Sequence, residues 1–369
     1  MRLAFITGSL VHGGAERHSI TLANRLAERG HECHAVYVKN DPSQLERLRL
    51  PPPSSVRCLH ARSYLDLRAL GHLASFFARI RADAVLACNP YALLYASLAR
   101  PGAPLLVTLH STRNRSLKES AQMLAYRPFF WAADCAVFVA ERQRVHWQRR
   151  GLFGRQNRVI YNGVDLDHWQ PVCAPHEDFV IGMSAVLRPE KNPTQLVDAV
   201  AALCRRGIPA RALFIGDGPL RGEVQARAVR EGIADRVTIT GLQQDVRPFL
   251  AACDALALTS FTEAFSLAAV EAMALGLPVV HSNVGGAAEM ITHGEDGFLF
   301  PVGDTHSLVE SLAALARPEV RRRLGARARQ TVETRFTERA MVEQYEQTLS
   351  DMASKRSNRE QLRRRVAAH

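Results

Sequence analysis

The sequence lacks the features that mark several large classes of protein. No stretch approaches eighteen consecutive apolar residues, so no transmembrane helix is predicted. None of the seven cysteines forms a C-x-x-C pair, which disfavours a zinc site or a disulfide framework and indicates reduced thiols in a cytosolic protein. Thr7 and Gly8 interrupt the N-terminal apolar run, which therefore suits a first strand better than a signal peptide.

Acidic residues are in the minority. Asp and Glu number 36 against 47 Lys and Arg, which gives a net charge of +11 and indicates an anionic partner: nucleotide, nucleic acid or acidic membrane surface. The alternative is a soluble protein that is merely basic. No basic run is interleaved with aromatic residues, so nucleic acid is not expected as a partner. No cluster of His, Cys and carboxylates has metal-ligand spacing, so neither a metal nor another cofactor is expected.

Apolar segments in the first half alternate between strand-like and helix-like spacing. Strands are predicted near residues 2–7, 32–38, 55–60, 83–88, 104–110, 134–139 and 157–161, and helices near 15–29, 65–81, 91–99, 116–132 and 141–150. Strand–helix–strand units connect parallel strands, so this half predicts a doubly wound parallel sheet.

A second series of the same kind follows a linker near residues 168–178. Strands are predicted at 179–184, 210–215, 237–240, 255–258 and 277–281, and helices at 193–206, 219–231, 246–252, 266–275, 305–315, 318–334 and 337–351. We therefore predict an α/β protein with two Rossmann-like domains, 1–170 and 171–351, facing a central cleft. The last predicted helix either stays on the second domain or crosses back to the first. Residues 352–369 form a basic tail, interpreted as a solvated helix or a basic arm.

The stretch 263–280, E-A-F-S-L-A-A-V-E-A-M-A-L-G-L-P-V-V, combines two carboxylates with a helix start. A helix beginning near Ser266 would present free backbone N–H groups and its positive dipole end to the preceding loop, a candidate anion site. Glu271 falls on an otherwise apolar helix, where a carboxylate needs donors such as sugar or ribose hydroxyls. The alternative interpretation is that Glu263 and Glu271 are both solvated.

Other loops with glycine or charge follow predicted strands, where ligands bind in parallel sheets. The loop 8–14 leads into a helix but lacks the G-x-G-x-x-G pattern, which disfavours NAD. His110 ends a strand, and Arg188 and Lys191 lie where they could neutralise a diphosphate. A capping histidine and a solvated turn are the alternatives. The D-x-D at 165–167 is interpreted as turn acids of the linker.

The order of these motifs resembles the GT-B fold retaining glycosyltransferases of family 4, the glycosyl transferases group 1. The matches are G-G-A-E-R at 13–17, T-L-H at 108–110, N-G-V-D at 162–165, L-R-P-E-K-N at 187–192, G-D-G-P at 216–219, E-A-F-S-L-A-A-V-E at 263–271, G-L-P-V-V at 276–280 and V-G-G at 284–286 with Glu289. They extend over almost the whole chain, and the spacing of the two glutamates in 263–271 is the most specific of them. The resemblance implies a hexosyltransferase-type enzyme that needs no metal.

The resemblance also implies roles for individual residues. It assigns the chemistry to His110, Glu263 and Lys191, and the donor to Gly14, Arg188, Lys191, Gly216, Gly218, Leu242, Glu263, Phe265, Ser266, Leu267 and Glu271. Glu271 would hold the ribose hydroxyls, Glu263 would contact the transferred sugar, and Lys191 would pair with the diphosphate. Backbone N–H groups of residues 265–267 would meet the sugar and phosphates, in agreement with the helix-dipole argument.

One position departs from the pattern of the family. Many relatives carry a diphosphate-binding arginine five residues before the lysine, where this sequence has Val186, and an arginine stands at 188 instead. Either Arg188 substitutes from a shifted position, or the phosphates depend more on Lys191.

The first half of the chain also carries an uneven distribution of charge. Between residues 113 and 158 there are ten basic residues (113, 115, 118, 127, 142, 144, 149, 150, 155 and 158) against three acids (119, 134 and 141). In the family this domain faces the acceptor, so the excess predicts docking on an anionic membrane leaflet or an acidic glycolipid, with a solvated basic face as the alternative.

The resemblance therefore predicts transfer of a sugar from a nucleotide-diphospho-sugar, UDP-sugar favoured and GDP-mannose second, to a hydroxyl of a glycan or lipid-linked acceptor. Polysaccharide or lipopolysaccharide biosynthesis, in the cytoplasm or peripherally on the inner leaflet, is the expected setting. Two alternatives remain open: a UDP-sugar 2-epimerase-like isomerase on the same fold, and a non-catalytic glycosyltransferase subunit.

Overall fold

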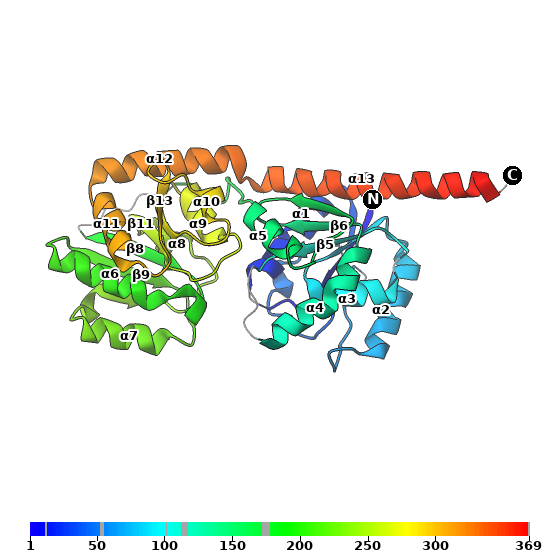
Figure 1. The fold of residues 1–369 in the computed structure, drawn as a ribbon, viewed down its shortest axis with the longest axis horizontal. Coiled ribbons are helices and arrows are strands. Elements are labelled where there is room, and N and C mark those ends of the chain that lie inside the picture. Colours follow the sequence, from blue (N-terminus) through cyan, green and yellow to red (C-terminus); the bar gives the residue numbers. More distant parts are fainter. Residues whose placement is uncertain (12, 52–54, 101, 112–116, 172–177, 368–369) are drawn as a thin grey trace. The chain divides into compact units, whose positions relative to one another are not determined.

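Two compact units make up the chain. The computed structural model describes residues 1–11, 13–51, 55–100, 102–111, 117–171 and 178–367. Unit 1 comprises Met1–Tyr161 and Met341–His369, and unit 2 comprises Asn162–Ala340. Each unit is an α/β layer structure around one parallel sheet (Figure 1).

The sheet of unit 1 has seven parallel strands in the order β3-β2-β1-β4-β5-β6-β7. The strands are β1 (Arg2–Thr7), β2 (Glu32–Tyr37), β3 (Val56–Cys58), β4 (Ala84–Ala87), β5 (Leu105–Leu109), β6 (Cys135–Phe138) and β7 (Gln156–Val159). The strand order reverses between β1 and β4, and ligands of such sheets bind outside the carboxyl ends of the strands at this reversal.

The helices of unit 1 cover both faces of the sheet. They are α1 (Gly14–Glu28), α2 (Leu67–Ile80), α3 (Pro90–Ala99), α4 (Leu117–Ala132), α5 (Glu141–Gln148), the short η1 (Leu45–Arg47) and most of α13 (Glu338–Ala367). Side-chain caps begin two of them: Asp66 accepts from the N–H groups of Arg68 and Ala69, and Asn89 accepts from Ala92.

Unit 2 repeats the architecture with six parallel strands in the order β10-β9-β8-β11-β12-β13. The strands are β8 (Phe179–Ser184), β9 (Ala210–Ile215), β10 (Val237–Ile239), β11 (Ala255–Leu258), β12 (Val279–Ser282) and β13 (Gly297–Phe300). The helices are η2 (Pro189–Lys191), α6 (Pro193–Arg205), α7 (Arg221–Arg230), η3 (Ala234–Arg236), α8 (Arg247–Ala251), α9 (Leu267–Ala274), α10 (Ala287–Met290), α11 (Thr305–Leu315) and α12 (Pro318–Arg335). Here the strand order reverses between β8 and β11.

The predicted class of two Rossmann-like α/β domains is confirmed, and most predicted elements lie within two residues of the observed ones. The strand β13 and the short helix α10 are additions that the sequence analysis did not contain.

The units divide at different residues from the predicted ranges 1–170 and 171–351. Segment 162–170 belongs to unit 2, where the Val164 N–H donates to the Phe336 carbonyl and the Glu338 N–H donates to the Val164 carbonyl. The predicted linker partly lies outside the described residues, which omit 172–177.

The helix α13 continues to Ala367, well past the predicted end at 351. Met341, Tyr345 and Leu349 are buried against β1, β4 and β6 in a core cluster of unit 1. The predicted tail 352–369 is therefore helical as far as the backbone is described, and the side chains of 357–369 lie outside the described residues. In the described chain, no helix combines the length and apolar character that a membrane span requires.

Candidate active site

The strand order of unit 2 brings the two loops with the strongest sequence signals together. Lys191 ends η2 in the loop after β8, and Glu263 lies in the loop after β11, on the two strands that flank the reversal. The Nζ of Lys191 and the Oε2 of Glu263 form an ion pair, with 27% and 17% of the side chains exposed. The pair is thus partly shielded while remaining accessible to a ligand.

Hydrogen bonds hold these two loops to each other. The Thr259 hydroxyl donates to the backbone carbonyls of Lys191, at 3.0 Å, and Asn192, at 2.7 Å. The Phe261 N–H donates to the Glu190 carbonyl at 2.8 Å. The backbone on both sides of the ion pair is therefore fixed, which pre-organises the charged groups.

A third loop, which follows β12, packs against the backbone of Glu263 and Ala264. Gly285 has a φ of +50°, and a Cβ at this position would overlap with the Glu263 carbonyl oxygen. The Gly286 N–H donates to the Ala264 carbonyl at 2.8 Å. The glycines at 285–286 therefore hold the backbone of the loop that carries Glu263 in place.

The helix α9 begins directly after the loop that carries Glu263. The Ser266 hydroxyl caps it by accepting from the Ala269 N–H at 3.2 Å. The first turn of the helix directs its N–H groups and positive dipole end toward residues 263–266. Phe265, Ser266 and Leu267 thus lie at the start of α9, and the anion site at this position stays a prediction.

Glu271 and Arg188 differ strongly in their surroundings. Glu271 is in the middle of α9 and only 4% exposed, in contrast to the solvated alternative. Arg188 precedes η2 and is half-buried, and its guanidinium forms no ion pair or hydrogen bond with any described residue. It therefore remains available to an anion beside Lys191.

The two glycines of the G-D-G-P turn allow it to pack against the backbone that follows β8. A Cβ on Gly216 would overlap with the Ala185 carbonyl, and one on Gly218 would lie 2.5 Å from the Leu187 carbonyl. The turn therefore packs directly on the loop that leads to Lys191. Leu242 follows Gly241, which is bridged to Gly216, and its side chain is 67% exposed.

A buried histidine lies at the end of β12 near the ion pair. His281 is 0% exposed, and its Nδ1 lies 2.7 Å from the Ser282 carbonyl, so Nδ1 carries the proton. Burial lowers the pKa of His281 to about 4; Glu263 raises this pKa and Lys191 lowers it. The sequence analysis did not single out this residue, because one histidine in an apolar strand gives no signal.

The depressed pKa of His281 predicts loss of stability in acid. Between its ordinary pKa of 6.5 and about 4, the unfolded chain binds a proton that the folded chain excludes. Stability from this group is fully present above pH 6.5 and is lost as the pH falls to about 4, by up to about 3 kcal/mol. Denaturant unfolding of the wild type and His281→Asn at several pH values checks this. The wild type should lose more stability than the variant across this window, and equal losses would contradict the assignment.

In unit 1, the predicted residues Gly14 and His110 follow the carboxyl ends of β1 and β5, two strands that β4 separates in the sheet. Gly14 begins α1 after β1, and His110 follows β5. The ring of His110 packs on that of His18 from α1, with 4.7 Å between ring centroids. Burial lowers the pKa of His110 to about 4, so this imidazole is neutral near pH 7. His18, one turn after Gly14, is a neighbour that the sequence analysis missed.

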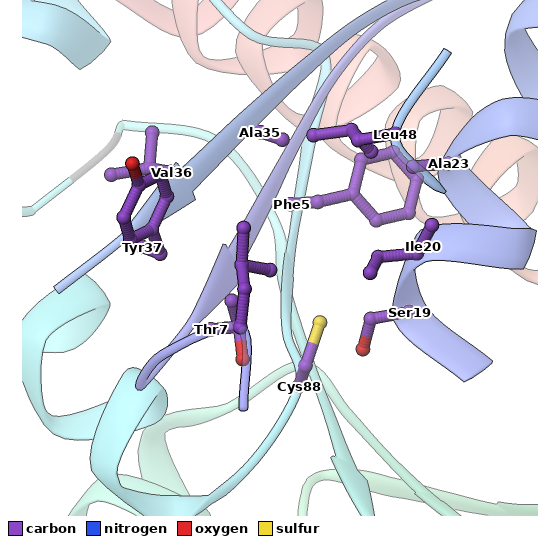
Figure 2. A pocket seen from close by; sticks show the side chains of 11 residues that line it. Phe5, Thr7, Ser19, Ile20, Ala23, Ala35, Val36, Tyr37, Leu48 and Cys88 are labelled. Atoms are coloured by element: carbon purple, nitrogen blue, oxygen red, sulfur yellow. The ribbon is translucent and has the colours of Figure 1, made fainter. Parts of the chain in front are cut away.

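Figure 2 shows an apolar hollow of unit 1 between α1 and the strands β1 and β2. Its volume is about 300 Å³, including open solvent. Phe5, Ile20 and Tyr37 line it, each less than a tenth exposed, together with the small polar groups of Ser19 and Cys88. It offers no charged group and is therefore no candidate for a diphosphate.

Other predicted features have ordinary surroundings. Among the described residues, no three His, Cys, Asp or Glu side chains gather as a metal site. Asp165 accepts from the Asp167 N–H, as expected of turn acids. The six described cysteines are unpaired with one another, and Cys173 lies outside the described residues.

The predicted basic face is partly neutralised within unit 1. Arg144 pairs with Glu141. Arg155 pairs with Asp134, and Arg158 with Asp351. The members at 113 and 115 and the side chain at 118 lie outside the described residues.

Comparison with known proteins places these features in a family. The model described as Glycosyltransferase Family 4 matches residues 12–168, and that described as Glycosyl transferases group 1 matches residues 169–331. The chain is 36% identical to N-acetyl-alpha-D-glucosaminyl L-malate synthase of Bacillus anthracis over 166 residues, which cover 45% of this chain and 43% of that relative. It is 29% identical over 353 residues to the lipopolysaccharide core biosynthesis glycosyltransferase LpsE of Rhizobium meliloti (strain 1021), covering 92% and 96% of the two chains.

Among solved structures, the chain is similar to Anabaena Alr3699/HepE in complex with UDP. The TM-score is 0.80 at 25% identity, and the match covers 95% of this chain and 100% of that one. The two family models together span residues 12–331, and the doubly wound sheets agree with the structural match. The chain therefore belongs to the GT4-type glycosyltransferases of GT-B fold.

Proposed function

We propose that the chain transfers a sugar from a nucleotide-diphospho-sugar, UDP-sugar favoured over GDP-mannose, to a hydroxyl of a glycan or lipid-linked acceptor. The observation that carries the proposal is the ion pair of Lys191 and Glu263 at the reversal of the unit 2 sheet, next to the start of α9. The UDP complex of the Anabaena neighbour supports the nucleotide. The role of LpsE in lipopolysaccharide core biosynthesis supports a cell-surface glycan as product.

In this proposal, positive groups of unit 2 stabilise the leaving diphosphate. Lys191 has three donors, so it can bind phosphate oxygens while keeping Glu263 as a partner. Arg188, which has no competing partner among the described side chains, is the second cation. The N–H groups at the start of α9 are the third component. Charge that develops on the diphosphate as the glycosidic bond breaks is thus stabilised without a metal.

The carboxylates of the proposal bind hydroxyl groups. The buried Glu271 accepts from the ribose hydroxyls, which are donors suited to a shielded carboxylate. Glu263 accepts from the hydroxyls of the transferred sugar. The acceptor hydroxyl attacks on the face from which the diphosphate leaves, so the anomeric configuration is retained. Neutral His110 belongs to this proposal as a group beside the reacting sugar.

The acceptor side of the proposal rests on charge. The net charge of +11 and the basic residues of segment 113–158 favour an anionic glycolipid or leaflet, with peripheral membrane association. Binding to such a surface is electrostatic and falls with salt.

A thermal-shift comparison of UDP, GDP and ADP tests the donor. A ligand that binds the folded state raises stability by mass action, about 2.7 kcal/mol at 100 times its Kd. UDP should raise the Tm more than the other two nucleotides. A larger Tm shift with GDP would indicate a guanine nucleotide as donor, and no shift with any of the three nucleotides would contradict the proposal.

Incubation with UDP-GlcNAc in the absence of acceptor separates transfer from the isomerase alternative. The proposal expects at most slow release of UDP under these conditions, and release that rises when an acceptor is added. Epimerised sugar formed without acceptor would favour the isomerase.

A further inference from the structure

A second hollow, lined by charged groups, lies in unit 1 at the amino ends of the strands. It has a volume of about 700 Å³, including open solvent, and is bounded by residues directly before β5, β6 and β7 and by α13. His110 lies beyond the carboxyl end of β5, and the five residues of that strand separate the two positions by roughly 15 Å. The hollow is therefore distinct from the candidate active site.

The walls of the hollow differ in character. Ala103, Pro104 and Met352 contribute apolar surface, while Arg155, Lys355 and Arg356 contribute three positive charges. Asp134 is the one acid among its lining residues in the described chain. This combination suits an anionic group attached to a short apolar skeleton.

The nearby carboxylates are already occupied by protein groups. Asp134 accepts from the Leu105 N–H at 3.0 Å and pairs with Arg155 at 3.3 Å. Asp351, one turn before Lys355 on α13, pairs with Arg158 at 3.0 Å and accepts from Gln347 at 2.7 Å.

Lys355 is the cation with spare binding capacity. It is exposed and makes no ion pair or hydrogen bond with any residue that the structure describes. Arg155 and Arg158 are paired with the carboxylates of Asp134 and Asp351, so the ammonium of Lys355 adds a positive charge that these two acids do not balance. An incoming anion would therefore bind Lys355 without displacing these two ion pairs.

We propose that this hollow is a binding site for a phosphate group. A phosphomonoester carries close to two negative charges near pH 7 and is attracted to the three cationic side chains that line the hollow. Arginine binds phosphate oxygens with paired N–H donors, and lysine adds a point charge. The carbon skeleton of the ligand contacts Met352 and Pro104. The phosphate belongs either to a lipid headgroup or to a soluble phosphorylated molecule, and this site is separate from that of the proposed donor.

Charge reversal of the hollow tests the site in the full chain. The double variant Arg155→Glu/Lys355→Glu removes its two most exposed cations, and Arg155→Gln/Lys355→Gln is a milder second variant. The control Arg322→Glu/Arg323→Glu makes the same change of charge at two exposed arginines of α12 that have no partner among the described residues. Inorganic phosphate, followed by ³¹P NMR, probes soluble phosphate. Phosphatidylcholine vesicles with and without phosphatidic acid probe the lipid source.

The expected result is saturable phosphate binding that both hollow variants weaken by roughly tenfold or more and the control leaves unchanged. Binding of phosphatidic acid vesicles that is lost in the same variants identifies a lipid headgroup; binding of inorganic phosphate alone identifies a soluble ligand. The thermal shift with UDP should be equal in all proteins, which separates this test from that of the donor. No binding of either probe, or equal loss in the control, would overturn the proposal.

Discussion

Replacement of Lys191 by alanine is expected to lower donor turnover by roughly 10²–10³-fold while the protein remains folded. The ammonium of Lys191 forms an ion pair with Glu263 and, in the proposed reaction, binds the leaving diphosphate. Its loss removes stabilisation of charge that is greatest in the transition state. Because the ion pair is partly exposed, the free energy of unfolding should change by only about 1 kcal/mol. Steady-state turnover and denaturant unfolding of the same preparation measure both quantities.

A variant of Glu263 separates two possible roles of Lys191, which are binding of the diphosphate and positioning of Glu263. If Lys191 acts only by holding Glu263, then Lys191→Ala, Glu263→Gln and the double variant should all have about the same turnover. If Lys191 also contacts the diphosphate, the double variant should be slower than Glu263→Gln. Arg206→Ala, at an exposed ion pair of unit 2, is the matched control and should be active. Normal turnover in folded Lys191→Ala would contradict the role of the lysine.

Replacement of Gly285 by alanine is expected to abolish most activity through the backbone alone. The new Cβ would overlap with the Glu263 carbonyl, and the residue has a φ of +50°, where a side chain is strained. We expect a loss of roughly 2–5 kcal/mol in stability. Displacement of the loop that carries Glu263 should lower turnover about 10²-fold or more. Thermal unfolding and turnover check the two effects.

The matched control is Gly303→Ala. Gly303 has a φ of +77° but nothing within 4 Å of an added Cβ, so only the backbone strain of about 1–2 kcal/mol remains. Turnover by Gly303→Ala should be close to that of the wild type. If Gly285→Ala were no worse than Gly303→Ala in both measurements, the contact with Glu263 would have no importance for the site.

The fold was largely predictable because its signals are local. Most strands and helices of the two units carry their own apolar pattern, and strand–helix–strand connections between parallel strands are right-handed. The last turns of α13 are an exception, because they follow a basic sequence that resembles a solvated tail.

The candidate site was predictable as a set of residues but not as contacts. Lys191 and Glu263 each follow a predicted strand, yet their pairing across 72 positions depends on the order of β8 and β11 in the sheet. The contact between the tilted rings of His18 and His110 likewise depends on the fold, which brings α1 close to the end of β5.

The glycines show why a motif does not reveal its physical reason. The resemblance assigns Gly216 and Gly218 to donor binding, and the structure adds that they allow close approach of the backbone after β8, because a Cβ at either position would overlap with that backbone.

The central claim is that unit 2 binds a nucleoside diphosphate where the loops after β8 and β11 meet the start of α9. A crystal structure of the full chain with UDP tests it most directly. We expect the diphosphate within hydrogen-bond distance of Lys191 and of the N–H groups at the start of α9, and the ribose hydroxyls at Glu271. UDP bound elsewhere on the chain, or a diphosphate that contacts neither Lys191 nor α9, would contradict it.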